Sequence, residues 1–407
     1  MRVLYTLLLR LALPLVLARL WWRGRREPGY REFIAERFGR YGGDVAPRVL
    51  WIHAVSVGEV RAASPLIRAL QAALPDHAVL LTCTTASGRA MAKQVYGESV
   101  LCAYLPYDYP EAVQRFIERF RPRLGVLMET EIWPNLIAAC AACEIPLVLA
   151  NARMSEKSSA AYERWWSLFY PAFASFSAVC AQSADDADRL RGLGASVVQV
   201  SGNLKFDVEL DAAQLERGRL WRRRLGRPVL LFASTREGEE QMLLGALPAW
   251  DGKLLVVVVP RHPQRFEALA PLAQARRSRD EFPAVGQKVY LGDSMGEMAF
   301  YYGACDVAVI GGSFAPLGGQ NLIEALAAGV PVVAGPSMYN FAEATRLAVE
   351  AGAALQAADA PSAIRAAMSL VDKSEKREAM AAAGKNLCEA NRGATQRHVA
   401  TCLKLLK

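Results

Sequence analysis

The chain has 407 residues, of which 53% are hydrophobic and 22% charged, and it carries a net charge of +8. This composition excludes a disordered chain, and the length exceeds what one hydrophobic core usually supports, so two domains are expected. Residues 1–40 contain nine Arg and three acidic residues and so contribute +6 of the net charge of +8. A basic excess at one end argues against a nucleic-acid groove and favours contact with an anionic membrane surface.

The amino-terminal segment from Val3 to Trp22 has the length and apolar character of a membrane helix and is followed by "RGRR". Arg10 lies near its middle, where a charge at the bilayer centre costs roughly 2.5–3.5 kcal/mol. A helix lying flat in the interface, with Arg10 and Arg19 reaching to water, is the alternative to a spanning helix. Both alternatives place the rest of the protein at the inner, cytoplasmic face.

Short apolar runs alternate with amphipathic stretches from Pro47 onward, as is typical of parallel sheets covered by helices on both faces. Seven candidate strands precede a charged amphipathic stretch at 211–227, and five follow it: 49–55, 78–84, 100–106, 124–130, 145–151, 177–183, 196–202, then 228–234, 253–260, 288–292, 306–312 and 330–335. This restart predicts two similar α/β domains in tandem, with a boundary near residues 203–227.

The first candidate site is "HAVSVGEV", residues 53–60, where an apolar strand turns into a helical pattern. Such a turn projects its side chains from the carboxyl edge of a parallel sheet, where open α/β folds bind ligands. Glu59 would lie at the start of the helix, whose dipole favours the carboxylate anion. Glu59 is therefore a candidate for proton abstraction from a substrate hydroxyl.

The stretch "VLMETEIWPN", residues 126–135, is a second strand exit and carries Glu129 and Glu131. Two residues apart on an extended segment, they would share a face. With Glu59 they could place more than one carboxylate at the site, although an acidic surface loop remains the alternative.

Three strand exits in the second half carry residues suited to a nucleotide. "VVVVPRHP" places Arg261 at the end of a very apolar strand, where its planar fork could pair with a phosphate. "ASTREGEE" adds Arg236, and the backbone of "GDSMGEM", residues 292–298, could frame a base. An ordinary basic loop or a helix cap is the alternative at each position.

A glycine-bearing loop follows the strand at 306–312 and leads into a helix expected to start near Asn321. Glycines allow close backbone approach, and helix N–H groups attract phosphate. Glu324, one turn into the helix, could reach a ribose hydroxyl pair. Alternatively, Asn321 and Glu324 form only a local cap.

Several familiar motifs are missing from the sequence. It has neither the G-x-G-x-x-G of dinucleotide enzymes nor the P-loop of NTPases. The pair Asp186 and Asp188 fits the acidic start of a helix capped by Ser183 better than a metal site. Cys140 and Cys143, the one C-x-x-C, lie in an alanine-rich helical pattern and are expected to pack rather than to bind metal.

Eight motifs, in this order between residues 53 and 326, resemble the bacterial 3-deoxy-D-manno-octulosonic acid (Kdo) transferases of lipid A assembly: "HAVSVGE", "LPYD", "METEIWPN", "NARMS", "SGNLKFD", "VPRHP", "GDSMGE" and "GGQNLIEAL". The amino terminus is similar to theirs as well, so the resemblance covers essentially the whole chain. It implies a GT-B glycosyltransferase with two facing Rossmann-like domains and a membrane-anchor helix. The implied divisions are an anchor at 1–22, an acceptor domain at 23–206 and a CMP-Kdo domain at 207–407.

The same resemblance implies inverting transfer of Kdo from CMP-Kdo to lipid A precursor (lipid IVA) at the cytoplasmic face of the inner membrane, without metal or other cofactor. Glu59 takes the place of the general base, and Glu129, with Glu131 as the alternative, that of a second acidic residue. The positions matching the family's CMP site are Pro260, Arg261, Met295, Gly296, Glu297, Asn321, Leu322, Ile323 and Glu324. Arg236 stands where His would also be accepted in relatives.

Two rival interpretations remain open from the sequence. One is another GT-B enzyme that uses a UDP-sugar, either a transferase or a nonhydrolysing epimerase. The other is a membrane-associated binding or scaffold protein that kept the fold and lost the chemistry. The number of Kdo residues transferred and the state of self-association are not set by the sequence.

Overall fold

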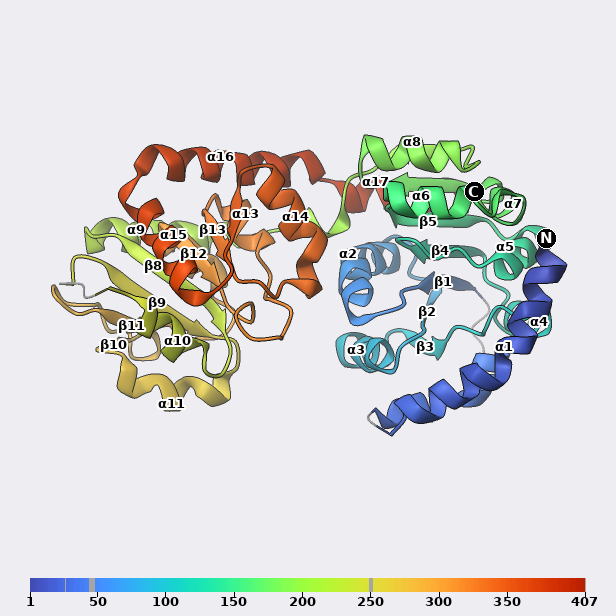
Figure 1. The fold of residues 1–407 in the computed structure, drawn as a ribbon, viewed down its shortest axis with the longest axis horizontal. Coiled ribbons are helices and arrows are strands. Elements are labelled where there is room, and N and C mark those ends of the chain that lie inside the picture. The colour runs from blue at the N-terminus through green and yellow to red at the C-terminus, as the bar shows by residue number, and fades with distance from the viewer. Residues whose placement is uncertain (26, 44–47, 249–251, 407) are drawn as a thin grey trace. The chain divides into compact units, whose positions relative to one another are not determined.

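The computed structural model describes residues 1–25, 27–43, 48–248 and 252–406 (Figure 1). The chain forms two compact units: unit 1 is Met1–Leu204 with Gly393–Lys407, and unit 2 is Lys205–Arg392. The sequence placed the whole of 207–407 in the second domain. The structure corrects this for the last segment, because the final helix packs into the core of unit 1.

Unit 1 contains a seven-stranded parallel sheet with the order β3-β2-β1-β4-β5-β6-β7. Its strands are β1 (Val49–His53), β2 (Ala78–Cys83), β3 (Leu101–Tyr104), β4 (Leu124–Met128), β5 (Leu147–Ala152), β6 (Ala178–Ala181) and β7 (Val198–Val200). Its helices are α1 (Arg2–Arg23), α2 (Val57–Ala73), α3 (Ala86–Tyr96), α4 (Pro110–Phe120), α5 (Pro134–Ala142), α6 (Glu156–Glu163), α7 (Trp166–Ala174), α8 (Ala184–Gly192) and α17 (Ala394–Leu405).

Both faces of this sheet are buried, as the continuous apolar runs predicted. In β1, Val49 and Trp51 pack in one core cluster with residues of α4, α5, α7 and α8. Leu50 and Ile52 point the other way, into a cluster with α2, α3 and α17. Alternate side chains of a strand face opposite sides, so a strand buried on both faces must be apolar throughout.

Unit 2 repeats the arrangement with the order β10-β11-β9-β8-β12-β13-β14, also parallel. Its strands are β8 (Val229–Thr235), β9 (Leu255–Pro260), β10 (Ala275–Arg276), β11 (Val289–Leu291), β12 (Val307–Ile310), β13 (Val332–Ala334) and β14 (Ala354–Gln356). Its helices are α9 (Ala212–Leu225), α10 (Glu239–Ala246), α11 (Phe266–Leu269), α12 (Met298–Ala304), α13 (Ile323–Ala328), α14 (Ala342–Glu350), α15 (Ala360–Asp372) and α16 (Ser374–Asn391).

All twelve predicted strands are present, and two more, β10 and β14, form the edges of the second sheet. They escaped prediction and are only two and three residues long. The similarly short β7, β11 and β13 were predicted because they lie within longer apolar runs, whereas no such run surrounds β10 and β14.

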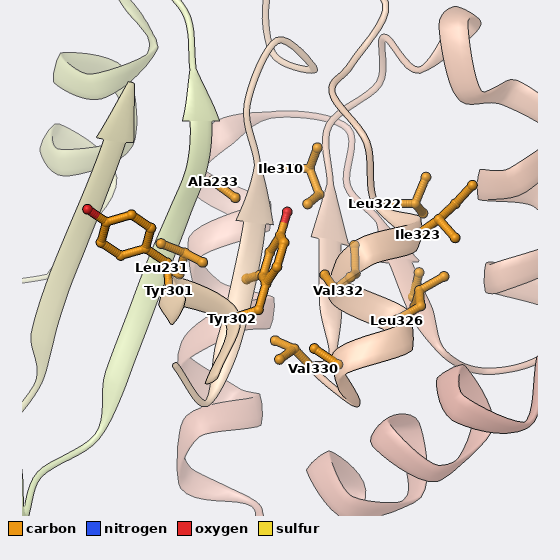
Figure 2. Packing of buried hydrophobic residues seen from close by; sticks show 14 of the residues in the cluster. Leu231, Ala233, Tyr301, Tyr302, Ile310, Leu322, Ile323, Leu326, Val330 and Val332 are labelled. Carbon is orange, nitrogen blue, oxygen red and sulfur yellow. The ribbon is translucent and has the colours of Figure 1, made fainter. Parts of the chain in front are cut away.

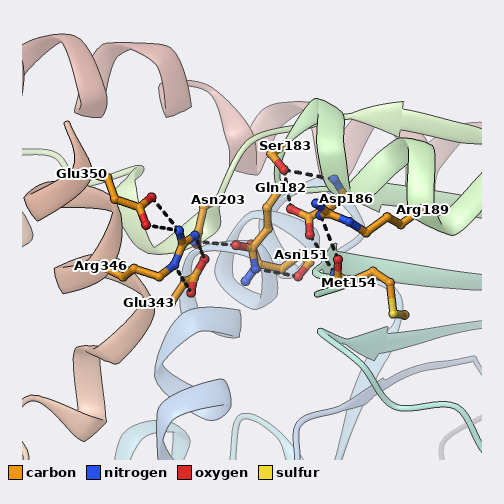
Figure 3. A network of polar contacts seen from close by, with 10 residues as sticks. All are labelled: Asn151, Met154, Gln182, Ser183, Asp186, Arg189, Asn203, Glu343, Arg346 and Glu350. Carbon is orange, nitrogen blue, oxygen red and sulfur yellow. Dashed lines mark hydrogen bonds and ion pairs between the residues drawn. The ribbon is translucent and has the colours of Figure 1, made fainter. Parts of the chain in front are cut away.

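The motifs "NARMS" and "SGNLKFD" meet in a polar network within unit 1 (Figure 3). Gln182 donates to the Asn151 carbonyl at 2.9 Å, and Asn203 donates to the Gln182 side chain at 2.8 Å. Asn151 also accepts the Leu204 N–H at 3.0 Å and donates its own N–H to His398 of α17 at 2.9 Å. These motifs therefore join the ends of the later strands and hold the carboxyl-terminal helix.

Candidate active site

In unit 1, two candidate loops follow neighbouring strands at the point where the strand order reverses. β1 lies between β2 and β4, and His53 at its end is paired with Leu127 of β4. The crevice outside the carboxyl ends of two such strands is the usual ligand site of an open parallel sheet. The loops that carry Glu59 and Glu129 therefore begin side by side at this edge.

Glu59 lies in the first turn of α2, and its Oε2 accepts a hydrogen bond from the Val55 N–H at 2.7 Å. The Val55 carbonyl accepts two hydrogen bonds from Thr85, one from its N–H at 3.2 Å and one from Oγ1 at 2.9 Å. The carboxylate is thus held at a helix amino terminus, where the dipole favours negative charge. The contact with Val55 is also what a purely structural cap would make.

Glu129 lies in a turn that Glu131 directly follows, so the two are not in the extended segment that the sequence predicted. β4 ends at Met128, and Glu129 has a φ of 58°, a left-handed conformation that is unfavourable for a residue with a side chain. Strand periodicity therefore does not place Glu129 and Glu131 on one face. Glu131 Oε2 accepts the Trp133 indole N–H at 2.9 Å and lies 3.8 Å from His53 Nε2. Unfavourable backbone conformations of this kind concentrate at functional sites.

The motif "LPYD" caps α5, the helix that follows this turn. The buried Asp108 carboxylate accepts the backbone N–H groups of Asn135 at 3.0 Å and Leu136 at 2.7 Å. Burial raises the pKa of Asp108, and these two N–H groups oppose the shift. The cap fixes the start of α5 and with it the end of the "ETE" turn.

In unit 2, a cavity of about 430 Å³ collects residues that are far apart in the sequence. Five of the nine predicted donor-site residues line it: Pro260, Arg261, Met295, Gly296 and Glu324. They come from the end of β9, the loop after β11 and the first turn of α13. The volume falls in the range of small-molecule sites, and the location at strand carboxyl ends is the one expected for a ligand.

The remaining residues of the "NLIE" motif hold the local structure. The side chains of Leu322 and Ile323 are buried in the core of unit 2 (Figure 2), so only their backbone is available to a ligand. Asn321 donates to Glu324 Oε1 at 2.9 Å and accepts the Ile323 N–H at 3.0 Å. This is the local cap named as the alternative, and α13 begins at Ile323, two residues later than expected.

Glu297, the last of the nine predicted donor-site residues, does not line the cavity, and its carboxylate is bound by a neighbouring arginine. Arg277 donates two hydrogen bonds to it, at 2.9 and 3.0 Å. These hydrogen bonds lower the pKa of Glu297 and keep it ionised.

Electrostatic contacts tie the donor-side residues together. Burial raises the pKa of Glu324, and the nearby positive charge of Arg261 opposes this shift. Loss of hydration and the charges of Arg236 and Arg261 lower the pKa of His262. The neutral His262 ring accepts a hydrogen bond from Arg236 Nη1 at 2.9 Å, which joins the loops after β8 and β9.

A buried carboxylate holds the glycine-bearing loop in place. Glu239 accepts three backbone N–H groups, from Arg236 at 2.9 Å, Gly312 at 2.6 Å and Phe314 at 2.9 Å. A Cβ atom at Gly311 would lie 2.5 Å from the backbone of β8, so glycine is required for this close approach. The loop after β12 is therefore fixed against the loop after β8, at the point where the strand order of the second sheet reverses.

Nine further residues line the cavity without having been predicted individually as donor-site residues: Glu209, Leu210, Asp211, Gln214, Ser234, Val259, Ser294, Met298 and Ala299. Glu209 and Leu210 precede the amphipathic stretch in a segment without periodicity, so nothing in the sequence marks them. Gln214 donates to the Gly296 carbonyl at 3.1 Å and so touches the "MGE" loop directly. Within the described residues, no three His, Cys, Asp or Glu side chains are grouped as metal ligands.

Two Rossmann-like units with seven-stranded parallel sheets, each with candidate residues where its strand order reverses, form the GT-B glycosyltransferase fold. Solved structures share this fold. MurG of Acinetobacter baumannii covers 88% of this chain and 99% of its own at a TM-score of 0.56 and 15% identity. UDP-GlcNAc 2-epimerase of Neisseria meningitidis covers 88% of this chain and 100% of its own, with a TM-score of 0.51 and 17% sequence identity.

The chain belongs to the Kdo transferase family. The family described as "3-Deoxy-D-manno-octulosonic-acid transferase (kdotransferase)" matches residues 32–208, and "Glycosyl transferases group 1" matches residues 276–387. The chain is 46% identical to the 3-deoxy-D-manno-octulosonic acid transferase of Bordetella pertussis, covering 97% of each chain. It is 38% identical to that of Haemophilus influenzae, covering 97% of this chain and 96% of the relative.

Proposed function

We propose that this Kdo transferase moves Kdo from CMP-Kdo to lipid A precursor at the cytoplasmic face of the inner membrane. The observation that carries the donor assignment is the cavity of unit 2, where Arg261, Met295 and Glu324 converge from separate strand exits. Arg261 would bind the phosphate through its planar fork, and Glu324 would accept hydrogen bonds from the ribose. The loop at Met295 and Gly296 would frame the base.

Unit 1 would hold the acceptor, with Glu59 as general base. Its carboxylate is oriented by the Val55 N–H and lies at a helix amino terminus. The helix dipole stabilises the anion and so limits its basicity, which means that the proton is taken late, after attack has made the hydroxyl acidic. Glu129, or Glu131 as the alternative, would supply a second carboxylate, and the left-handed backbone of Glu129 is the sign of a position held under constraint.

In the proposed reaction, the acceptor hydroxyl attacks the anomeric carbon of Kdo as the bond to CMP breaks. The attacking oxygen enters opposite the leaving phosphate, so the configuration at that carbon is inverted. Glu59 receives the hydroxyl proton, and CMP leaves with the electron pair of the broken bond. Arg261 would stabilise the charge that develops on the phosphate.

The experiment that tests this function is transfer from CMP-Kdo to a tetraacylated, bisphosphorylated lipid A precursor, followed by mass. We expect a product heavier than the acceptor by one or more Kdo residues, and the mass gives the number added. A native protein that binds CMP and leaves this acceptor unchanged would refute the acceptor assignment.

The amino-terminal helix is proposed to lie flat on the membrane instead of crossing it. α1 is the one helix in the described residues that is long and apolar enough to span, with a mean hydropathy of 1.9. Yet three of its residues contact the globular part of unit 1: Thr6 meets Asn135 at 2.9 Å, Leu9 accepts from Tyr109 at 3.0 Å, and Arg10 pairs with Glu111 at 3.1 Å.

These contacts come from the first half of the helix, within the apolar segment that a spanning helix would bury in lipid. The helix also exposes large apolar side chains along its length: Val3, Leu4, Leu7, Leu8, Leu11, Leu15, Leu17, Trp21 and Trp22. A helix that is bonded to the globular part and still exposes many apolar side chains is suited to the interface plane. Anionic lipid would then attract the arginines that follow it.

We expect the double variant Leu7→Gln/Leu11→Gln to bind anionic lipid vesicles at least about tenfold more weakly than the native protein. Burying each leucine side chain in lipid is worth roughly 1.5–3 kcal/mol. Cosedimentation with vesicles measures the effect, and Val285→Gln, a fully exposed valine of unit 2, is the matched control. Membrane-bound protein that resists extraction by alkaline carbonate would show instead that the helix spans.

A further inference from the structure

His53, the last residue of β1, is a buried histidine to which the proposed mechanism gives no role. Its Nδ1 lies 3.0 Å from the Thr82 carbonyl oxygen and 2.9 Å from Thr82 Oγ1. Thr82 pairs with Nδ1 in either tautomer, because its carbonyl oxygen can accept a hydrogen bond and its hydroxyl can donate one. Nε2 is then the ring atom left to interact with the site.

His53 Nε2 is buried and has no hydrogen-bond partner among the residues that the structure describes. It faces Oε2 of Glu131 at 3.8 Å, on a side chain that is 18% exposed. The same Oε2 accepts the Trp133 indole N–H at 2.9 Å. Buried polar atoms nearly always have a hydrogen-bond partner. The unpaired Nε2 opposite a carboxylate therefore indicates a hydrogen bond that forms when the two side chains move closer together.

We propose that His53 is a positioning residue for Glu131: in the tautomer that accepts the Thr82 hydroxyl at Nδ1, the Nε2–H donates to Oε2, which fixes the carboxylate and leaves Oε1 for the acceptor. The proposal rests on the proposed function, in which a carboxylate of the "ETE" motif serves the acceptor. The atoms stand about 1 Å farther apart than a hydrogen bond, a gap that a small rotation of the Glu131 side chain closes. His53 and Trp133 then both bind Oε2.

The position of His53 in the sheet explains why it is suited to this task. It belongs to a central strand and is paired with Leu127 of β4, whereas Glu131 follows the turn after that strand. Side chains carried by strands are placed more accurately than side chains carried by loops. In this arrangement the backbone of Glu129 makes the turn, and Glu131 is the carboxylate that the fold orients.

The kinetic test compares two substitutions that damage opposite ends of the ring. His53→Asn keeps a donor near Nδ1 for Thr82 and removes Nε2, whereas His53→Gln places an amide near Nε2. We expect His53→Asn to lower kcat by about tenfold or more, because a hydrogen bond to a charged group is lost, and His53→Gln to retain more activity. Thermal unfolding and CMP binding of each variant report whether the fold and unit 2 are intact.

A double-mutant cycle separates positioning from packing. If His53 acts through Glu131, the His53→Asn change adds no further loss of kcat in a Glu131→Gln background. If the double variant instead loses kcat by the product of the two single-variant factors, the proposal is overturned. Full activity of Glu131→Gln beside an inactive Glu129→Gln would also overturn it, a result that leaves the proposed function standing.

A second measurement does not depend on transfer activity. The chain has four histidines, so the NMR spectrum of ¹⁵N-histidine-labelled protein contains few imidazole nitrogen signals. The signals that disappear in His53→Asn belong to His53. We expect the Nε2 signal to shift between native protein and Glu131→Gln. An unchanged signal overturns the proposal even if transfer is normal. If the signal shifts and no transfer occurs, the pair exists and the proposed function fails.

Discussion

Replacing Glu59 with glutamine is expected to reduce kcat for Kdo transfer by about 10²–10⁴-fold, the usual contribution of a positioned general base. The amide cannot take the acceptor proton, yet its oxygen can still accept the Val55 N–H that holds the side chain. The fold and the donor cavity of unit 2 should therefore be unaffected. Transfer from CMP-Kdo, followed under saturating donor and acceptor, measures the loss.

The control for this variant is Glu98→Gln, an exposed carboxylate of the same unit. It should transfer at the native rate. Thermal unfolding with and without CMP should give the same shift for Glu59→Gln as for the native chain. Full activity of Glu59→Gln would refute the assignment of the base, and loss of the CMP shift would indicate damage to the fold.

Replacing Arg261 is expected to have the largest effect on the donor side. Arg261→Ala should lower kcat by about 10²–10³-fold, because one preorganised group that stabilises developing charge is removed. It should also weaken CMP binding, since a phosphate loses its paired guanidinium. Arg261→Lys should recover only part of the activity, because an ammonium group cannot make the planar two-point contact.

Ligand-induced thermal shifts test the donor assignment directly. A ligand at 100 times its Kd stabilises the native protein by about 2.7 kcal/mol, so CMP should raise the melting temperature of the native chain and UDP should not. Arg279→Ala, an exposed arginine of the same unit, serves as the control and should keep the CMP shift. Equal shifts with UDP and CMP would favour the UDP-sugar enzymes that share this fold.

The sequence predicted the parts of the fold that repeat a pattern. Strands such as Val49–His53 and Leu255–Pro260 are largely apolar because both of their faces are covered. A continuous apolar run of this kind can be recognised in the amino-acid sequence. The restart of the strand and helix pattern after residue 227 likewise predicted two sheets. The same reasoning placed Glu59 correctly in the first turn of a helix, because a strand-to-helix turn has a local signature.

What the sequence did not predict depends on contacts between distant segments. Glu209 and Leu210 line the cavity only because the chain enters unit 2 beside the "MGE" loop. Leu322 and Ile323 match the family's donor motif, yet their side chains fill the core (Figure 2), which a motif alone does not reveal. The turn at Glu129 was also hidden, because a left-handed glutamate has no pattern in the sequence.

The return of the carboxyl-terminal helix has a consequence for biosynthesis. Ala394, Val399 and Cys402 of α17 complete a core cluster whose other members lie almost entirely before residue 205, and His398 accepts the Asn151 N–H at 2.9 Å. On the ribosome, the sheet of unit 1 emerges first, but the face that α2 and α3 cover in part is not completed until α17 has been translated. Unit 2 is one continuous segment and can complete its core before α17 is made. Unit 1 is therefore synthesised first but completes its core after unit 2.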